Sequence, residues 1–323
     1  MIRIAIVLGC VCALASSGAA MVGGAPPTSE GAGRAVVMLT GSHGTFCSGV
    51  ALGRELVLTA AHCVLPGANY KLVEFDGARQ PALKDLAVIA RHPDFDVNAV
   101  LRHRVTADVA LAKLAAPLKV VPAVLAPAGG SVAAGDRFVV AGYGVATHGD
   151  GKTGGTVRAA TLVATGQPGT LQIRLADPAT KGERAGLGAC TGDSGAPVYR
   201  DVGGALAVIG VVSWPTGPAL SEGCGGLTGV TPLARYRAWL VGQAGKMGSP
   251  LAPLSRTSIV PDRGRDGAQV SGNRRILRRQ FLDIAGLHVG GHHARPLGAG
   301  AKEPSAPPHH ARGVKRIAWD EEL

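Results

Sequence analysis

Between Ala35 and Thr231 the chain consists of short apolar runs separated by Gly and Pro. Some runs alternate apolar with polar residues, as expected for strands with one buried face, and others are continuous and suited to burial on both faces. Helical periods are rare in this part of the chain, so the pattern predicts an antiparallel barrel or sandwich. The predicted strands are Ala35–Leu39, Leu56–Thr59, Leu86–Ala90, Val109–Leu114, Phe138–Gly142, Val157–Ala164, Leu171–Leu175 and Ala205–Val212.

One helix is predicted after the last strand. Thr231 is a suitable N-cap, and Pro232 fits the first helical position. Gly242 and Gly245 are expected to end this helix. Its apolar stripe, which should pack against the barrel, consists of Leu233, Tyr236 and Leu240.

The composition changes after residue 245. Residues 246–323 hold 13 Lys/Arg and 7 Asp/Glu and so carry +6 of the net charge of +11, although they make up less than a quarter of the chain. They are rich in Pro and Gly, and only Asn273–Leu287 has a helical pattern, so this tail is predicted to be largely disordered. A basic patch interleaved with aromatic residues is missing from the sequence, so nucleic acid is not an expected partner.

The N-terminus has the pattern of an export signal. Arg3 is followed by the uncharged, mostly apolar run Ile4–Leu14 and by small residues that end at Gly18-Ala19-Ala20. The apolar run is too short to span a bilayer as a helix, so no stable membrane anchor is expected. The predicted organisation is a signal peptide at residues 1–20, a folded domain at 21–245 and the tail at 246–323, in a secreted or periplasmic protein.

Four cysteines remain after the predicted signal: Cys47, Cys63, Cys190 and Cys224. An even set in an exported protein suggests two disulfides, and spacing alone allows three pairings. A zinc site is the alternative, but the four include no CxxC pair, so no metal site is predicted.

Three segments carry candidate chemistry. His62 follows an apolar run and small residues, Asp108 opens a buried run, and Ser194 lies in the glycine-rich string Gly192–Gly195. Each segment alone is commonplace in loops and strand ends. Together, in the order His, Asp and Ser, they indicate a serine nucleophile with a histidine base and an aspartate that orients the base.

The segments Thr59–Cys63 and Gly192–Gly195 resemble the two signature motifs of the trypsin/chymotrypsin-like serine proteases, and Asp108–Leu111 resembles the aspartate segment of that family. The resemblance extends from Met21 to Leu240. It implies an all-β fold of two antiparallel six-stranded β-barrels with a C-terminal helix, residues 25–130 forming the first barrel and 131–231 the second. It further implies a monomeric serine endopeptidase that acts on proteins or peptides and needs no cofactor.

The same resemblance assigns roles to the catalytic residues. His62 would act as general base, Asp108 would orient it and Ser194 would attack the peptide bond. The backbone N–H groups of Gly192 and Ser194 would form the oxyanion hole. The implied disulfides are Cys47–Cys63 and Cys190–Cys224.

The resemblance also places the substrate-binding residues. Gly188, six positions before Ser194, would lie at the base of the primary pocket, where an acid would select Arg or Lys. Because Gly188 is neutral and small, an uncharged side chain is expected before the cleaved bond. Gly229 would lie on the pocket wall. The segment that pairs with the substrate backbone would be Ser213-Trp214-Pro215, in which Pro215 replaces the usual Gly and cannot donate a hydrogen bond.

Met21-Val22-Gly23-Gly24 resembles the N-terminus that family members expose on activation. The ammonium of Met21 would then pair with Asp193, and because Met21 directly follows Ala20, removal of the signal would itself create the active N-terminus. The alternative is that cleavage falls elsewhere, for instance after Ala19, and that Asp193 has another partner.

Three other functions are compatible with parts of the sequence. The fold could serve as a non-proteolytic binding module, and the basic tail could bind an anionic surface. An esterase is disfavoured because its usual nucleophile elbow is missing and its triad follows another order.

Overall fold

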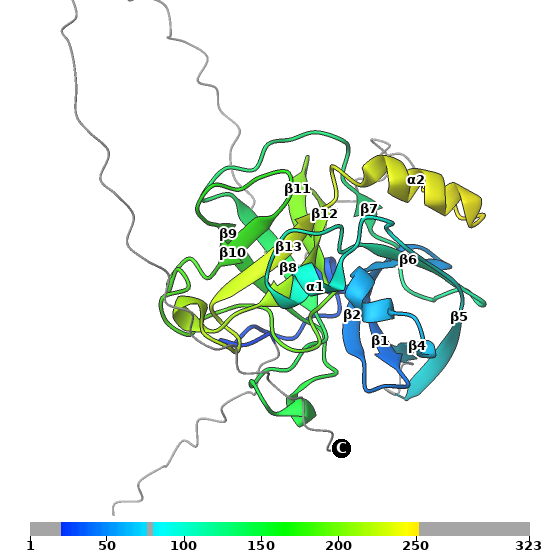
Figure 1. The fold of residues 1–323 in the computed structure, drawn as a ribbon. Coiled ribbons are helices and arrows are strands. Elements are labelled where there is room, and N and C mark those ends of the chain that lie inside the picture. The colour runs from blue at the N-terminus through cyan, green and yellow to red at the C-terminus, as the bar shows by residue number, and fades with distance from the viewer. Residues whose placement is uncertain (1–20, 76–79, 252–323) are drawn as a thin grey trace, which may run out of the picture. The chain divides into compact units, whose positions relative to one another are not determined.

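The computed structural model describes residues 21–75 and 80–251 (Figure 1). The predicted signal peptide at 1–20, the predicted helix at Asn273–Leu287 and the rest of the tail beyond residue 251 lie outside the described residues.

The first barrel is closed and antiparallel, with the strand order β1-β2-β3-β6-β5-β4. Two buried apolar clusters contain residues from these strands. A third cluster combines other residues of these strands with residues of the second barrel. Two of its strands were not predicted, because glycines and a serine interrupt the apolar pattern of β2 and charges interrupt that of β4. The six strands are β1 (Val36–Gly41), β2 (Phe46–Gly53), β3 (Leu56–Thr59), β4 (Tyr70–Phe75), β5 (Pro81–Arg91) and β6 (Ala110–Leu114).

The second barrel has the order β11-β8-β9-β10-β13-β12, and pairing of β11 with β12 closes it. A short strand, β7 (Val124–Leu125), adds to it in parallel beside β12, which the sequence did not predict. The expected fold of two six-stranded antiparallel barrels is therefore confirmed, with one parallel strand added. The strands of the second barrel are β8 (Arg137–Gly142), β9 (Arg158–Ala164), β10 (Ile173–Ala176), β11 (Pro197–Val202), β12 (Ala205–Pro215) and β13 (Leu227–Pro232).

The C-terminal helix α2 (Arg237–Lys246) exists and ends one residue beyond Gly245, but its predicted start is wrong. Thr231 and Pro232 belong to β13, where Thr231 pairs with Val211, so the strand ladder overrides the capping signal. Gly242 and Gly245 lie inside the helix, and the burial of Ala244 beside them helps to offset their low helix propensity. The predicted apolar residues Leu233, Tyr236 and Leu240 are all buried.

The chain before β1 packs against the second barrel, and this corrects the assignment of residues 25–130 to the first. Pro27 forms a β-bridge with Arg158 of β9, and Met21 and Ala25 lie in the core cluster that contains Phe138 of β8. The N-terminal segment therefore belongs to the barrel that carries Ser194. The remaining elements are α1 (Val97–Leu101) and the 3₁₀ helices η1 (Gly31–Gly33), η2 (Ala61–Val64), η3 (Gly151–Thr153) and η4 (Pro218–Leu220).

Among the described helices, none is both long enough and apolar enough to cross a membrane.

Candidate active site

His62 lies in η2, directly after β3, and is bonded to Asp108 at two points. Its Nδ1 lies 2.8 Å from Asp108 Oδ2, and its backbone N–H donates to Oδ1 at 3.0 Å. Ser213 Oγ also donates to Oδ2, at 2.5 Å. Three donors, two from His62 and one from Ser213, therefore fix the carboxylate and, through it, the imidazole ring.

Asp108 is completely buried, yet its pKa lies below its ordinary value. Burial alone would raise the pKa, but the neighbouring His62 and the hydrogen bonds from His62 and Ser213 outweigh it. The carboxylate is therefore charged at neutral pH and able to stabilise an imidazolium beside it.

Ser194 lies in a tight turn that packs against the first barrel. Its carbonyl oxygen accepts from the N–H of Ser48 on β2 at 2.8 Å. Cys63 Sγ lies 3.6 Å from the same carbonyl oxygen and 3.8 Å from His62 Nε2, which brings the turn beside the imidazole. Within the described residues no hydrogen bond joins Ser194 Oγ to His62 Nε2, and such bonds commonly tighten only when substrate is bound.

The glycines on either side of the nucleophile are required by space as well as by backbone conformation. Gly192 and Gly195 have φ values of +93° and +79°. A Cβ at Gly192 would lie 2.3 Å from Phe46 Cε1, and one at Gly195 would lie 2.2 Å from Thr59 Oγ1. The turn can therefore approach the first barrel only with glycine at both positions.

Two backbone N–H groups of this turn are left for a ligand. The N–H groups of Asp193, Gly195 and Ala196 donate to Cys190, Val212 and Asp193 carbonyls, respectively. Those of Gly192 and Ser194 have no acceptor in the part of the chain that the structure describes. These are the two donors that the resemblance assigns to an oxyanion hole.

Two disulfides support the same region. Cys47 of β2 is bonded to Cys63 beside His62, and Cys190 before the nucleophile turn is bonded to Cys224. These pairings are the two that the family resemblance implied.

The residues expected at the primary pocket lie together, but their side chains leave little space. Gly188 is buried, and its Cβ position lies 3.2 Å from Gly225 Cα. A Cβ at Gly229 would lie 2.1 Å from Trp214 Cε2, so the indole covers this wall. Trp214 is only 4% exposed, and the ring of His103 stacks on it with centroids 4.7 Å apart.

The strand that carries Trp214 is irregular at this point. A bulge interrupts the pairing of β12 with β13 between Val212 and Trp214, so Trp214 lies opposite Gly229 and Pro215 opposite Thr228. The indole Nε1 is buried without a hydrogen-bond partner in the described chain. The direction of this side chain depends on the bulge, which the sequence did not predict.

Asp193 is also completely buried, but no cation pairs with it among the described residues. It accepts N–H bonds from Cys190 and Gly144, both at 2.9 Å. Burial raises its pKa to about 7, which these two bonds only partly oppose. Met21 is fully buried in the same core cluster as Ala189 and Ala196, which flank the turn.

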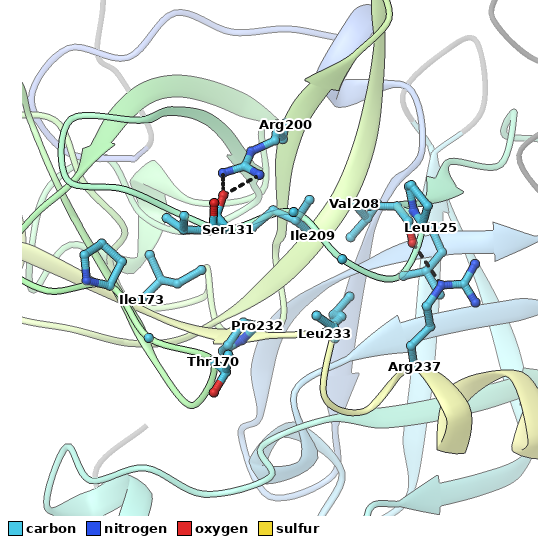
Figure 2. Close-up of a pocket in the computed structure, with 18 residues that line it drawn as sticks. Leu125, Ser131, Thr170, Ile173, Arg200, Val208, Ile209, Pro232, Leu233 and Arg237 are labelled. Atoms are coloured by element: carbon cyan, nitrogen blue, oxygen red, sulfur yellow. Dashed lines mark hydrogen bonds between the residues drawn. The ribbon is translucent and has the colours of Figure 1, made fainter.

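A cavity of about 210 Å³ lies elsewhere, on the second barrel (Figure 2). Its walls are mostly apolar, and its arginines are already engaged: Arg200 donates to the Ser131 carbonyl and Arg237 to the Ala126 carbonyl. None of the residues expected for catalysis or substrate binding lines it. The candidate active site therefore lies where the Ser194 turn meets the first barrel, around His62 and Asp108.

Comparison with known proteins agrees with this geometry. The family model described as Trypsin matches residues 21–240, about two thirds of the chain. The chain is also 26% identical over 192 residues to a trypsin of Phaedon cochleariae, an alignment that covers 52% of this chain and 68% of the relative. The chain belongs to the trypsin family of serine proteases.

Proposed function

We propose that this protein is an exported serine endopeptidase that cleaves peptide bonds through an acyl-enzyme, with His62, Asp108 and Ser194 as its triad. The observation that carries the proposal is the pairing of a buried, charged Asp108 with His62, beside a turn in which two N–H groups have no acceptor among the described residues. Such a site supplies a base, an orienting carboxylate and oxyanion donors without a cofactor.

The reaction follows from these positions. Ser194 Oγ attacks the carbonyl carbon while His62 Nε2 takes its proton, and the imidazolium is stabilised by Asp108. The carbonyl oxygen becomes an oxyanion that accepts from the N–H groups of Gly192 and Ser194. The C–N bond then breaks, His62 returns the proton to the amine, and water releases the acid by the same steps.

We also propose that the residue before the cleaved bond is uncharged and small. Gly188 offers no acid to a basic side chain, and the indole of Trp214 covers the wall formed by Gly229. Pairing of the substrate backbone would use Ser213 and Trp214, since Pro215 has no N–H to donate.

Activation is proposed to follow removal of residues 1–20. The buried Asp193 has no cationic partner within residues 21–75 and 80–251, and Met21 is already buried in the core cluster beside the nucleophile turn. The residues that follow Met21 also pack beside the nucleophile segment. Val22 forms a β-bridge with Gly188, and Gly23 lies close against the Gly186 backbone. An ammonium on Met21 would neutralise Asp193 and stabilise the turn.

The secreted protein, incubated with a fluorophosphonate probe and with a library of peptides, tests this proposal. We expect labelling at Ser194 and cleavage after small uncharged residues, both lost in Ser194→Ala with folding unchanged. Folded wild-type protein that neither reacts nor cleaves would instead be a binding module on this fold. Activity that survives Ser194→Ala would contradict the assigned nucleophile.

A further inference from the structure

Ser48 is a buried serine of β2 that no motif singled out, and it makes two hydrogen bonds to the nucleophile turn and a third to Tyr143. Its Oγ donates to the Gly192 carbonyl at 2.8 Å across 144 residues of sequence. The same Oγ accepts from the Tyr143 N–H at 2.9 Å, and its backbone N–H donates to the Ser194 carbonyl at 2.8 Å. One residue of the first barrel thus bonds to both residues whose N–H groups would hold the oxyanion.

The direction of the Gly192 N–H depends on how the neighbouring peptide units are held. In a trans peptide the C=O and N–H groups point in opposite directions. The Thr191 carbonyl, which belongs to the same peptide unit as the Gly192 N–H, accepts from the Val145 N–H at 2.9 Å. The Gly192 N–H therefore points away from Val145. The next unit, Gly192–Asp193, is held at its N–H by the Cys190 carbonyl and at its C=O by the Ser48 hydroxyl.

Gly192 is the weak point of this arrangement, because glycine can exchange its φ of +93° for many other values at little cost. The only side chain that the structure bonds to the carbonyl of this residue, within the described chain, is that of Ser48. Without the hydroxyl, a buried carbonyl and the Tyr143 N–H would lose a bond, and the peptide unit could rotate.

We propose that Ser48 is a positioning residue: its hydroxyl fixes the Gly192–Asp193 peptide and, together with the Val145–Thr191 bond on the preceding peptide, holds Gly192 with its N–H aimed at the oxyanion. This inference rests on the proposed protease function. Because the oxyanion exists only during the reaction, the hydroxyl contributes to kcat and not to substrate binding.

Ser48→Ala tests the inference in the mature enzyme with a slow peptide-amide substrate. Loss of one oxyanion donor costs about 10²–10³ in kcat, so loss of its support should cost about 10- to 100-fold, with KM within about twofold. A peptidyl boronate, whose adduct places an oxygen in the oxyanion hole, should lose affinity by a similar factor. A non-covalent product peptide should bind as before.

Thr59→Val is the matched control. Thr59 is equally buried and lies against Gly195 of the same turn, and its Oγ1 donates to the Ser48 carbonyl at 2.7 Å without bonding to Gly192. The Thr59→Val variant should retain a kcat within a few-fold of the wild-type value. Ser48→Thr, which restores a hydroxyl, should regain kcat, and Ser48→Gly provides a second hydroxyl-free variant if Ser48→Ala does not fold.

The results separate this inference from the proposed function. A folded Ser48→Ala or Ser48→Gly with parental kcat and boronate affinity would overturn the role of Ser48 while leaving the protease intact. An equal loss in Thr59→Val, or a loss confined to KM, would also overturn it. Failure of the wild-type enzyme to react with the fluorophosphonate would instead refute the protease function itself.

Discussion

Two aspartates, Asp108 and Asp193, are completely buried, and their environments shift their pKa values in opposite directions. Asp108 has a histidine partner and a serine donor, and its pKa is lowered. Asp193 has two backbone donors but no cation among the described residues, and its pKa is raised to about 7. Burial is the same for both, so the presence of a cationic partner decides whether a buried carboxylate is charged.

The two carboxylates therefore make opposite contributions to stability. Asp108, with a lowered pKa, stabilises the fold above its ordinary pKa, and this contribution is lost as the pH falls. Asp193, with a raised pKa, destabilises the fold as the pH rises through its titration range. We interpret Asp108 as a carboxylate that already has its partners, and Asp193 as one partner of an ion pair that forms only when the Met21 ammonium is released.

The largest effect is expected from Asp108→Asn. The amide can keep the bond from the His62 backbone N–H, but its NH₂ group then faces His62 Nδ1 and forces the proton onto Nε2, which can no longer act as base. We expect a loss in kcat on the order of 10⁴-fold, and a lower melting temperature because the stabilising charge of Asp108 is lost. Steady-state kinetics at neutral pH measures this, and an activity within tenfold of wild type would contradict the role of Asp108.

Asp193→Asn in the mature enzyme should have the next largest effect. Removing one partner of a buried ion pair costs about 3–5 kcal/mol, which here would loosen the turn that holds Gly192 and Ser194. We expect a loss in kcat/KM of about 10²–10³-fold together with a lower melting temperature. Near-normal activity would show that Asp193 is not paired with the N-terminus, and N-terminal sequencing of the active protein would show where the chain begins.

The motifs located the centre of the site because each is a short local string. The structure brings His62 and Asp108 within hydrogen-bonding distance and places the Ser194 turn beside them, as the order of the motifs predicted. The catalytic roles of these residues remain predictions. The two-barrel fold followed from the same resemblance. Four of the barrel strands, β2, β4, β11 and β13, nevertheless lie outside the predicted runs.

Other features depend on contacts between distant segments, which a single sequence does not reveal. The bond from Ser48 to Gly192 spans 144 residues. Thr231 was interpreted as a cap because the cross-strand pairing that makes it part of β13 is not local. The direction of the Trp214 ring likewise depends on a bulge and on the absence of a side chain at Gly229.

A smaller effect is expected on the pH dependence of the free energy of unfolding, which tests whether Asp193 is unpaired before the N-terminus is released. In a full-length Ser194→Ala chain that retains residues before Met21, the folded state binds more protons than the unfolded state between the ordinary pKa of 3.8 and about 7. Its free energy of unfolding should therefore fall by a few kcal/mol as the pH rises across that range. Adding Asp193→Asn should remove this part of the pH dependence, measured by urea unfolding at several pH values. Identical pH profiles for the two proteins would show that Asp193 is neutralised before the N-terminus is released.

The smallest effect is expected from Gly188→Asp, which adds a third carboxylate to the site. The new side chain would begin 3.2 Å from Gly225 Cα and 3.6 Å from Thr228 Oγ1, so a small shift of the neighbouring backbone is needed to accept it. If the primary pocket is based on Gly188, the carboxylate should attract a basic side chain before the cleaved bond, and relative activity on Arg and Lys substrates should rise about tenfold, with total activity reduced. Like Asp193, this carboxylate would have no cationic partner among the described residues, so a basic substrate side chain should favour its charged form. The preference for Arg should therefore weaken as the pH falls toward the pKa of the new acid. Cleavage profiles of the variant and of wild type at two pH values measure both effects. A wild-type profile already dominated by Arg and Lys would show that another residue forms the base of the pocket.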